Sequence, residues 1–177
     1  RSYEAALKSI ERIAKPSAQI MEAKQKILFQ LGTQSFANAN FEQALQYLNQ
    51  SITIGQYNRQ TKADAYYWCG ESYYRLNRMM EAARDFNAYL QLTTQPNNEM
   101  YALANYNLGY IAFHRKDYTQ ASNYFQKYIQ LEKGENRTAL ADAYNRIGDC
   151  HLNVRNFEEA KHYYSQAEQI NTHSGDY

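Results

Sequence analysis

The sequence predicts an all-α protein, an α-solenoid of about nine helices that pair antiparallel and stack in chain order. Three observations predict this fold class. Gly32, Gly70, Gly109 and Gly148 recur at intervals of 38, 39 and 39 residues. Twelve residues after each glycine stands an alanine, and sixteen residues after it stands a large apolar or aromatic residue. The chain holds only 7 Gly and 2 Pro, too few for the many tight turns of a sandwich or barrel.

The first predicted helix occupies residues 1–14. Tyr3 and Ala6 reproduce the spacing of Phe41 and Ala44, 38 residues later. We therefore expect residues 1–14 to be the second helix of a repeat whose first helix is missing. Because a repeat cannot bury its apolar face alone, the pattern predicts a fragment excised from a longer array.

Four complete repeats follow, and each divides into two helices. Tyr66, Cys69 and Tyr73 show the apolar spacing of a first helix, and Phe157 and Ala160 begin the stripe of a second helix. A short polar break separates the two helices, and small residues at facing positions let them approach closely. The predicted single segment 1–177 thus contains repeats at about 17–56, 61–95, 98–134 and 137–171.

Glycine, proline and capping residues lie where linkers between successive repeats are expected. Gly55 and Gly134 follow second helices, where glycine easily adopts a left-handed cap. Residues 61–64, which read Thr-Lys-Ala-Asp, resemble a capping box at the start of a first helix. Pro16 and Pro96 fall in linkers, where they interrupt no helix interior.

Charge and composition limit the function. The 19 Lys and Arg nearly balance the 18 Asp and Glu, which argues against a nucleic-acid or anionic-membrane binder. No apolar run is long enough to span a membrane. The 18 Tyr are the unusual feature, since tyrosine suits half-buried positions and binding surfaces.

Catalytic and metal-binding patterns are scarce, and we predict neither an enzyme nor a cofactor. Asp149, Cys150 and His151 are adjacent on one helix, so their side chains diverge and cannot converge on one metal. Cys69 occupies a core position and is expected to be buried. Cys69 and Cys150 lie two repeats apart, so we expect no intrachain disulfide.

The repeat resembles the tetratricopeptide repeat family. The matching residues are Tyr66, Cys69-Gly70, Tyr73, Ala82 and Phe86 in one repeat, with the same pattern from Tyr144 to Ala167. The family's usual period is about 34 residues, so these longer repeats imply helices or linkers longer by about one turn. Longer repeats of this kind resemble those of bacterial cell-envelope members. The resemblance implies a right-handed solenoid whose first helices line a concave face.

The resemblance also places the candidate binding residues. Some members grip a C-terminal carboxylate with Lys, Asn and Arg, but Thr33, Trp68 and Leu103 stand at the corresponding positions here. An aromatic groove with two polar side chains is expected instead, typical of protein-binding hot spots. The expected groove residues are Phe29, Phe36, Tyr67, Tyr74, Arg75, Tyr106, Tyr110, Phe113 and His114.

These residues predict a non-catalytic scaffold that binds a peptide or partner protein in the aromatic groove. One alternative is a glycan or small-ligand site on the same tyrosines, which a deep closed pocket would favour. Another is a structural spacer that forms a homo-oligomer through exposed end helices. The expected partners include no nucleic acid. The family occurs in the cytoplasm and in the bacterial periplasm or cell envelope, and the sequence does not choose between these locations.

Overall fold

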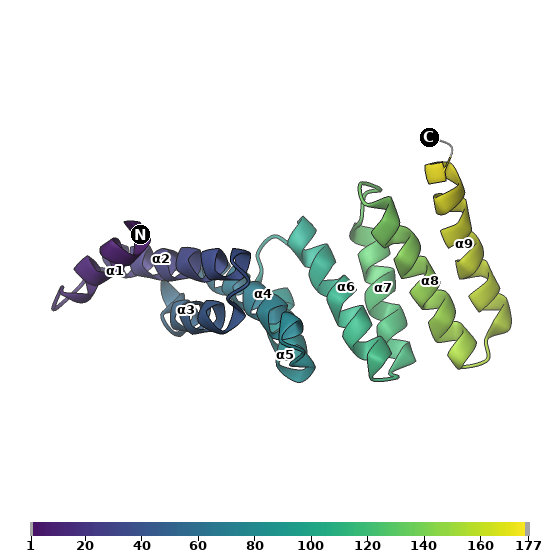
Figure 1. The fold of residues 1–177 in the computed structure, drawn as a ribbon, viewed down its shortest axis with the longest axis horizontal. Helices are drawn as coiled ribbons and strands as arrows, with labels where there is room; N and C mark the ends of the chain where they lie inside the picture. The colour runs from purple at the N-terminus through teal and green to yellow at the C-terminus, as the bar shows by residue number, and fades with distance from the viewer. Residues whose placement is uncertain (1, 176–177) are drawn as a thin grey trace. The chain divides into compact units, whose positions relative to one another are not determined.

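The computed structural model describes residues 2–175, and its regular elements there are nine α-helices and one 3₁₀ turn (Figure 1). This confirms the predicted all-α fold class. Residues 173–175 are described by their backbone alone. The helices are α1 (Ser2–Glu11), α2 (Ala18–Ala37), α3 (Phe41–Thr53), α4 (Arg59–Arg75), α5 (Met79–Leu92), α6 (Glu99–His114), α7 (Tyr118–Leu131), α8 (Arg137–Asn153) and α9 (Phe157–Gly175), and the 3₁₀ turn η1 is Gly55–Tyr57.

The chain divides into two compact units, Arg1–Pro96 and Asn97–Tyr177. Unit 1 contains α1 to α5, and unit 2 contains α6 to α9. The most extensive helix contacts are within the pairs α2–α3, α4–α5, α6–α7 and α8–α9. Contacts between α3 and α4, and between α7 and α8, join successive pairs inside each unit.

The repeated glycines bring the two helices of each pair together. A Cβ atom at Gly70 would lie 2.7 Å from the Phe86 ring, and one at Gly109 would lie 2.8 Å from the Phe125 ring. Gly32 faces Leu48 in the same way, and Gly148 faces Tyr164. The residue sixteen positions after each glycine therefore packs directly on the glycine backbone, as the spacing predicts.

The turn inside each pair has one backbone conformation in all four repeats. A non-glycine residue with φ between 60° and 66° stands seven residues after the repeated glycine. The next residue donates its backbone N–H to a carbonyl five residues earlier, as in Arg78 to Tyr73 and Asp117 to Ala112. This left-handed residue ends the first helix. The four residues are Ala39, Asn77, Lys116 and Arg155.

Two of the expected end signals are wrong. Gly55 has no positive φ and lies in η1, where its buried backbone packs against the side chain of Lys62. The chain therefore needs glycine there for close approach. Helix α4 begins earlier than the expected capping box, because Asn58 caps it by accepting a hydrogen bond from the Thr61 backbone N–H at 2.9 Å. Gly134 does adopt the left-handed conformation, with φ of 84°.

A buried glutamine fastens this linker to the first repeat of unit 1. The Gln25 amide donates to the backbone carbonyls of Asn58, at 2.8 Å, and Gly55. The Ser51 hydroxyl donates to the Gln25 carbonyl at 2.8 Å. These bonds give buried polar groups partners and position η1 before α4 begins.

Candidate functional site

The predicted groove residues stand on first helices, and each unit is described by itself. Arg75 and His114 are exposed, whereas Tyr67 is buried with 3% of its surface accessible. Most of the others are half-buried, so part of each ring reaches solvent. The half-buried residues are Phe29, Phe36 and Tyr74 in unit 1, and Tyr106, Tyr110 and Phe113 in unit 2.

In unit 1, Phe36 is the centre of an aromatic cluster that joins α2 to α4. Its ring centroid lies 5.0 Å from that of Trp68 and 5.2 Å from that of Phe41, both edge to face. The Arg75 guanidinium carbon lies 5.4 Å from the Phe36 ring centroid, close enough for a cation–π interaction. Trp68 is half-buried. We define the unit 1 aromatic face as Phe36, Trp68, Tyr74 and Arg75.

Tyr67 points in another direction. Its ring packs edge to face on Phe86 at 5.7 Å and on Tyr89 at 5.3 Å, and both of these rings are fully buried. Tyr67 therefore belongs to the core between α4 and α5, and its ring offers a partner almost no surface. The neighbouring Tyr74 stays on the face, and burial, aided by the charge of Glu71, raises its pKa.

In unit 2, two tyrosines of α6 share one carboxylate of α8. The hydroxyls of Tyr106 and Tyr110 both donate to Oδ2 of Asp142, the first at 2.6 Å. Burial, and then the hydrogen bond to Asp142, raises the pKa of both tyrosines above the usual value. Both rings also pack edge to face against Phe125, so their orientation is fixed on two sides.

Arg146 extends this arrangement along α8. Its Nη1 lies 2.8 Å from Asp149 Oδ2, and its Nε lies 3.6 Å from Asp142 Oδ1. The guanidinium carbon is 6.0 Å from the ring centroid of Phe113 on α6. Asp149 also accepts the Tyr164 hydroxyl of α9 at 2.5 Å. Two carboxylates and one guanidinium thus connect three helices of unit 2 through polar contacts.

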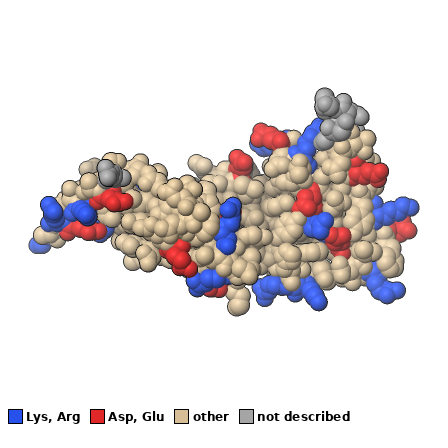
Figure 2. Space-filling model, in the orientation of Figure 1, with Lys and Arg blue, Asp and Glu red and all other residues tan. Residues whose placement is uncertain are grey.

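His114 completes this surface at the end of α6. Its ring centroid lies 6.0 Å from that of Tyr110 and 5.9 Å from that of Phe113. We define the unit 2 aromatic face as Tyr106, Tyr110, Phe113, His114 and Arg146. Over α6 to α9, acidic and basic side chains are interspersed on the surface shown in Figure 2.

Trp68 and Arg146 are absent from the sequence-based site, although both contact predicted residues. Each lies two positions before a repeated glycine and contacts the aromatic residue that lies four positions after the glycine of the preceding repeat. The contacts pair Trp68 with Phe36 and Arg146 with Phe113. Trp68 and Arg146 can be found in the sequence by comparing these two repeat positions in neighbouring repeats.

The described residues offer little for catalysis. Cys69 and Cys150 are both buried and free, and burial raises the pKa of the Cys150 thiol to about 11. Asp149 contacts Arg146, Cys150 is buried, and His151 stacks on Tyr163 with ring centroids 5.4 Å apart. The expected divergence of these three adjacent side chains is confirmed. Across residues 2–172, no three His, Cys, Asp or Glu side chains gather in a way that would hold a metal ion.

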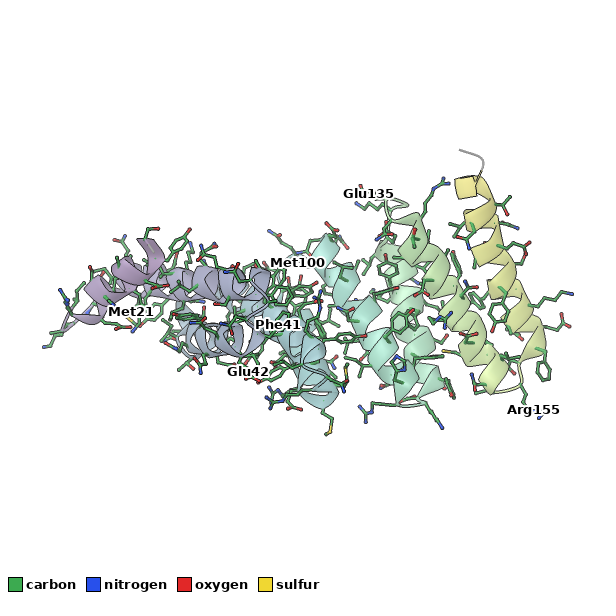
Figure 3. All side chains as sticks on the ribbon, in the orientation of Figure 1. Met21, Phe41, Glu42, Met100, Glu135 and Arg155 are labelled. Atoms are coloured by element: carbon green, nitrogen blue, oxygen red, sulfur yellow. The ribbon has the colours of Figure 1, made fainter. Side chains whose placement is uncertain are left out.

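Unit 2 contains a cavity of about 200 Å³ between the start of α6 and the α7–α8 loop. Its lining includes Asn98, Tyr128, Glu132 and Asn136, and none of the unit 2 aromatic face. Glu132 lies there as a loop cap, since its Oε1 accepts the backbone N–H groups of Glu135 and Asn136. The loop with Glu135 is labelled in Figure 3. This cavity therefore gives no support to a glycan site on the tyrosines.

None of the helices in the described part of the chain combines the length and apolar character that a membrane crossing requires.

Comparisons with known proteins identify the repeat. Residues 99–172 match the model of the family described as tetratricopeptide repeat. BtubC from P. vanneervenii is similar in structure with a TM-score of 0.75 and 15% identity, over 99% of this chain and 72% of that one. MamA gives a TM-score of 0.71 and 19% identity, over 99% of this chain and 92% of that one.

The apo form of RapI is also similar, with a TM-score of 0.72 and 15% identity over 98% of this chain. This chain spans 63% of the RapI chain. At these identities the likeness shows the fold. A search of curated proteins by sequence finds no match.

Proposed function

We propose that this chain, whose residues 99–172 match the tetratricopeptide repeat family, is a non-catalytic scaffold that holds a peptide or partner protein against aromatic faces of its first helices. The fold supports protein interaction in general. The specific surfaces are our proposal: they are the unit 1 aromatic face and the unit 2 aromatic face, each taken by itself.

One observation carries the proposal: half-buried rings of the unit 2 aromatic face are held rigidly while part of each remains accessible. Asp142 fixes the hydroxyls of Tyr106 and Tyr110, and both rings pack edge to face against Phe125. A ring that is already immobile loses little conformational entropy when a partner packs on it. Tyrosine and arginine in this setting are the residue types that dominate binding energy at protein interfaces.

The unit 1 aromatic face supports the same reading with fewer polar contacts. Trp68 and Phe36 pack edge to face, and Arg75 lies over the Phe36 ring while remaining exposed. A tryptophan and an arginine that contact the same phenylalanine ring offer a large apolar contact area together with hydrogen-bond donors. We expect apolar or aromatic side chains of the partner to occupy this face.

Peptides selected from a random library on the wild-type protein would test the site. We expect the pair Tyr74→Ala and Tyr110→Ala to lower the affinity for the selected peptides at least ~10-fold, because both rings are lost from the proposed faces. Fluorescence anisotropy measures this affinity. The matched control is Tyr47→Ala with Tyr124→Ala, since these half-buried tyrosines lie on second helices. Equal weakening in both pairs would contradict the proposed surface.

A photo-crosslinking residue provides an independent test of the same surface. Placed at His114, it should crosslink to the selected peptide, whereas the same residue at the exposed Lys127 of α7 should not. Binding of a glycan array in place of peptides would favour the alternative ligand class.

A further inference from the structure

The oxygen atoms of the unit 2 aromatic face are left as hydrogen-bond acceptors. Tyr106 and Tyr110 both direct their single hydroxyl hydrogen at Oδ2 of Asp142. A phenol oxygen that donates its hydrogen keeps its lone pairs, and an ionised carboxylate has no hydrogen to donate. A partner group that contacts these oxygens must therefore supply the hydrogen itself. This favours an amine or a guanidinium over a carboxylate or a carbonyl.

The charges beside these tyrosines do not cancel. Arg146 is a single cation between the carboxylates of Asp142 and Asp149, so one negative charge is left over. Arg146 is bound mainly to Asp149, because its Nη1 lies 2.8 Å from Oδ2 of that residue. Its Nε lies 3.6 Å from Oδ1 of Asp142, too far for a hydrogen bond, and this buried nitrogen has no hydrogen-bond partner among the described residues. The uncompensated charge therefore lies closer to Asp142 than to Asp149.

The aromatic rings around Asp142 favour a cation as well. The half-buried rings of Tyr106 and Tyr110 pack edge to face with their centroids 5.3 Å apart. The face of an aromatic ring carries negative charge and attracts ammonium and guanidinium groups. This surface already contains one such contact, because the Arg146 guanidinium carbon lies 6.0 Å from the Phe113 ring centroid. The Asp142 side chain is 31% exposed, so a group from outside can reach it.

We propose that the unit 2 aromatic face binds a lysine or arginine side chain of the partner, with the cationic group beside Asp142. The methylene stem of that side chain packs on Tyr106 and Tyr110. The inference rests on the proposed function, since it identifies the partner chemistry of the same face, and it concerns unit 2 alone. An acidic partner segment meets the left-over negative charge and is disfavoured.

Arg146 competes with the partner's cation in this arrangement. Because it partly neutralises Asp142, it weakens the attraction of that carboxylate for a second cation. Arg146→Gln should therefore raise the affinity for a basic peptide by ~3-fold or more, whereas Asp142→Asn should lower it. Replacing a residue that only supports the fold would lower the affinity in both cases. The opposite signs separate an effect of charge from an effect on structure.

Three synthetic pentapeptides test the charge preference on the full 177-residue chain. They share the sequence acetyl-Leu-Ala-X-Ala-Leu-amide, with lysine, norleucine or glutamate at X. Norleucine keeps the carbon chain of lysine and lacks the ammonium group, so it is the matched control. NMR titration of carbon-13-labelled tyrosine, assigned by Tyr106→Phe and Tyr110→Phe, gives both the affinity and the place of binding. We expect the lysine peptide to bind at least ~5-fold more tightly than the norleucine peptide, and the glutamate peptide to bind least tightly.

The protein variants locate the effect at Asp142. Asp142→Asn keeps an oxygen for the two tyrosine hydroxyls but removes the charge. It should therefore lower the affinity for the lysine peptide to that for the norleucine peptide, and leave the affinity for the norleucine peptide unchanged. Glu159→Gln, at an exposed position of α9, is the control and should change neither affinity. Circular dichroism checks the fold of each variant.

The titrations distinguish failure of the cation preference from failure of the proposed face. If the peptides shift the signals of Tyr106 and Tyr110 but lysine and norleucine bind equally, the cation preference is overturned and the proposed face remains. If no peptide shifts either signal, both the cation preference and the unit 2 aromatic face are overturned. A lower affinity for the lysine peptide in Arg146→Gln than in the wild type would also contradict the proposal.

Discussion

The backbone of Gly109 lies against the ring of Phe125, sixteen residues later, and a Cβ atom at position 109 would be 2.8 Å from Phe125 Cε1. Real Cβ atoms essentially never come this close to another heavy atom. Phe125 is fully buried, so its ring has no free space into which to turn. The antiparallel approach of α6 and α7 therefore depends on the missing side chain.

Gly109→Ala should destabilise unit 2 for this reason. Overpacking a core costs about 1–3 kcal/mol, and the better helix propensity of alanine returns at most about 1 kcal/mol. We expect the free energy of unfolding, measured by urea denaturation, to fall by about 1–2 kcal/mol. Gly148→Ala should cost less, because the facing Tyr164 ring is only half-buried and has room to move. A Gly109→Ala protein as stable as the wild type would contradict this account.

The repeat period predicts the close approaches well, because a position that must be glycine recurs at the same distance from the ring that covers it. It predicts the helix starts less well. Asn58 caps α4 from within a linker that holds η1, and the expected box at Thr61 lies inside the helix. The competing cap is an asparagine that recurs before the first helices α4, α6 and α8, as Asn58, Asn98 and Asn136, so a comparison of the linkers across repeats is the signal that finds it.

The candidate site is also predicted from the repeat only in part. Repeat positions place Tyr74 and Tyr110 on a half-exposed face, but exposure at a position depends on neighbouring repeats. Tyr67 and Tyr106 are equivalent in the repeat, yet the first is buried and the second is half-buried. Trp68 belongs to the unit 1 aromatic face and Arg146 to the unit 2 aromatic face, because each contacts a residue of the preceding repeat. A pattern taken one repeat at a time does not reveal such contacts.

The left-handed turn residues predict a stabilising substitution. Ala39 has φ of 61°, a conformation that costs a residue with a side chain about 1–2 kcal/mol. Ala39→Gly removes this cost but makes the unfolded chain more flexible, so we expect a net gain of about 0.5–1 kcal/mol. Asn77→Gly should gain less, because asparagine tolerates this conformation better than alanine does. Thermal unfolding of the two variants measures the order, and an equal gain would contradict it.

Asp85 predicts a dependence of stability on acid. Burial raises the pKa of this carboxyl group, and the adjacent Arg84 guanidinium, 2.9 Å away, opposes the shift only in part. A raised folded-state pKa contributes stability at low pH that is lost as pH rises through that pKa. Asp85→Asn resembles the protonated form. Its free energy of unfolding, relative to the wild type, should therefore increase between about pH 3 and pH 7.

Glu81 on the same helix supplies the control for Asp85. Its hydrogen bond to Arg78, at 2.7 Å, lowers the pKa of its carboxyl group. A lowered pKa contributes stability above the unfolded-state value, so the relative stability of Glu81→Gln should decrease over the same pH range. The two variants should have slopes of opposite sign in urea unfolding. Equal signs would show that burial does not dominate at Asp85.

Tyr164 predicts a loss of stability in alkali. Burial first, and then the hydrogen bond to Asp149 at 2.5 Å and the negative charge of that carboxylate, together raise the pKa of its hydroxyl to about 12. The ordinary value is 10.0. Because the folded-state pKa is the higher one, the stabilisation is complete below about pH 10 and disappears as pH rises toward 12. Carbon-13 NMR of labelled tyrosine, assigned by Tyr164→Phe, follows this titration. Asp149→Asn should lower the midpoint while burial keeps it above 10, whereas a wild-type Tyr164 that titrates near 10 would contradict the contact with Asp149.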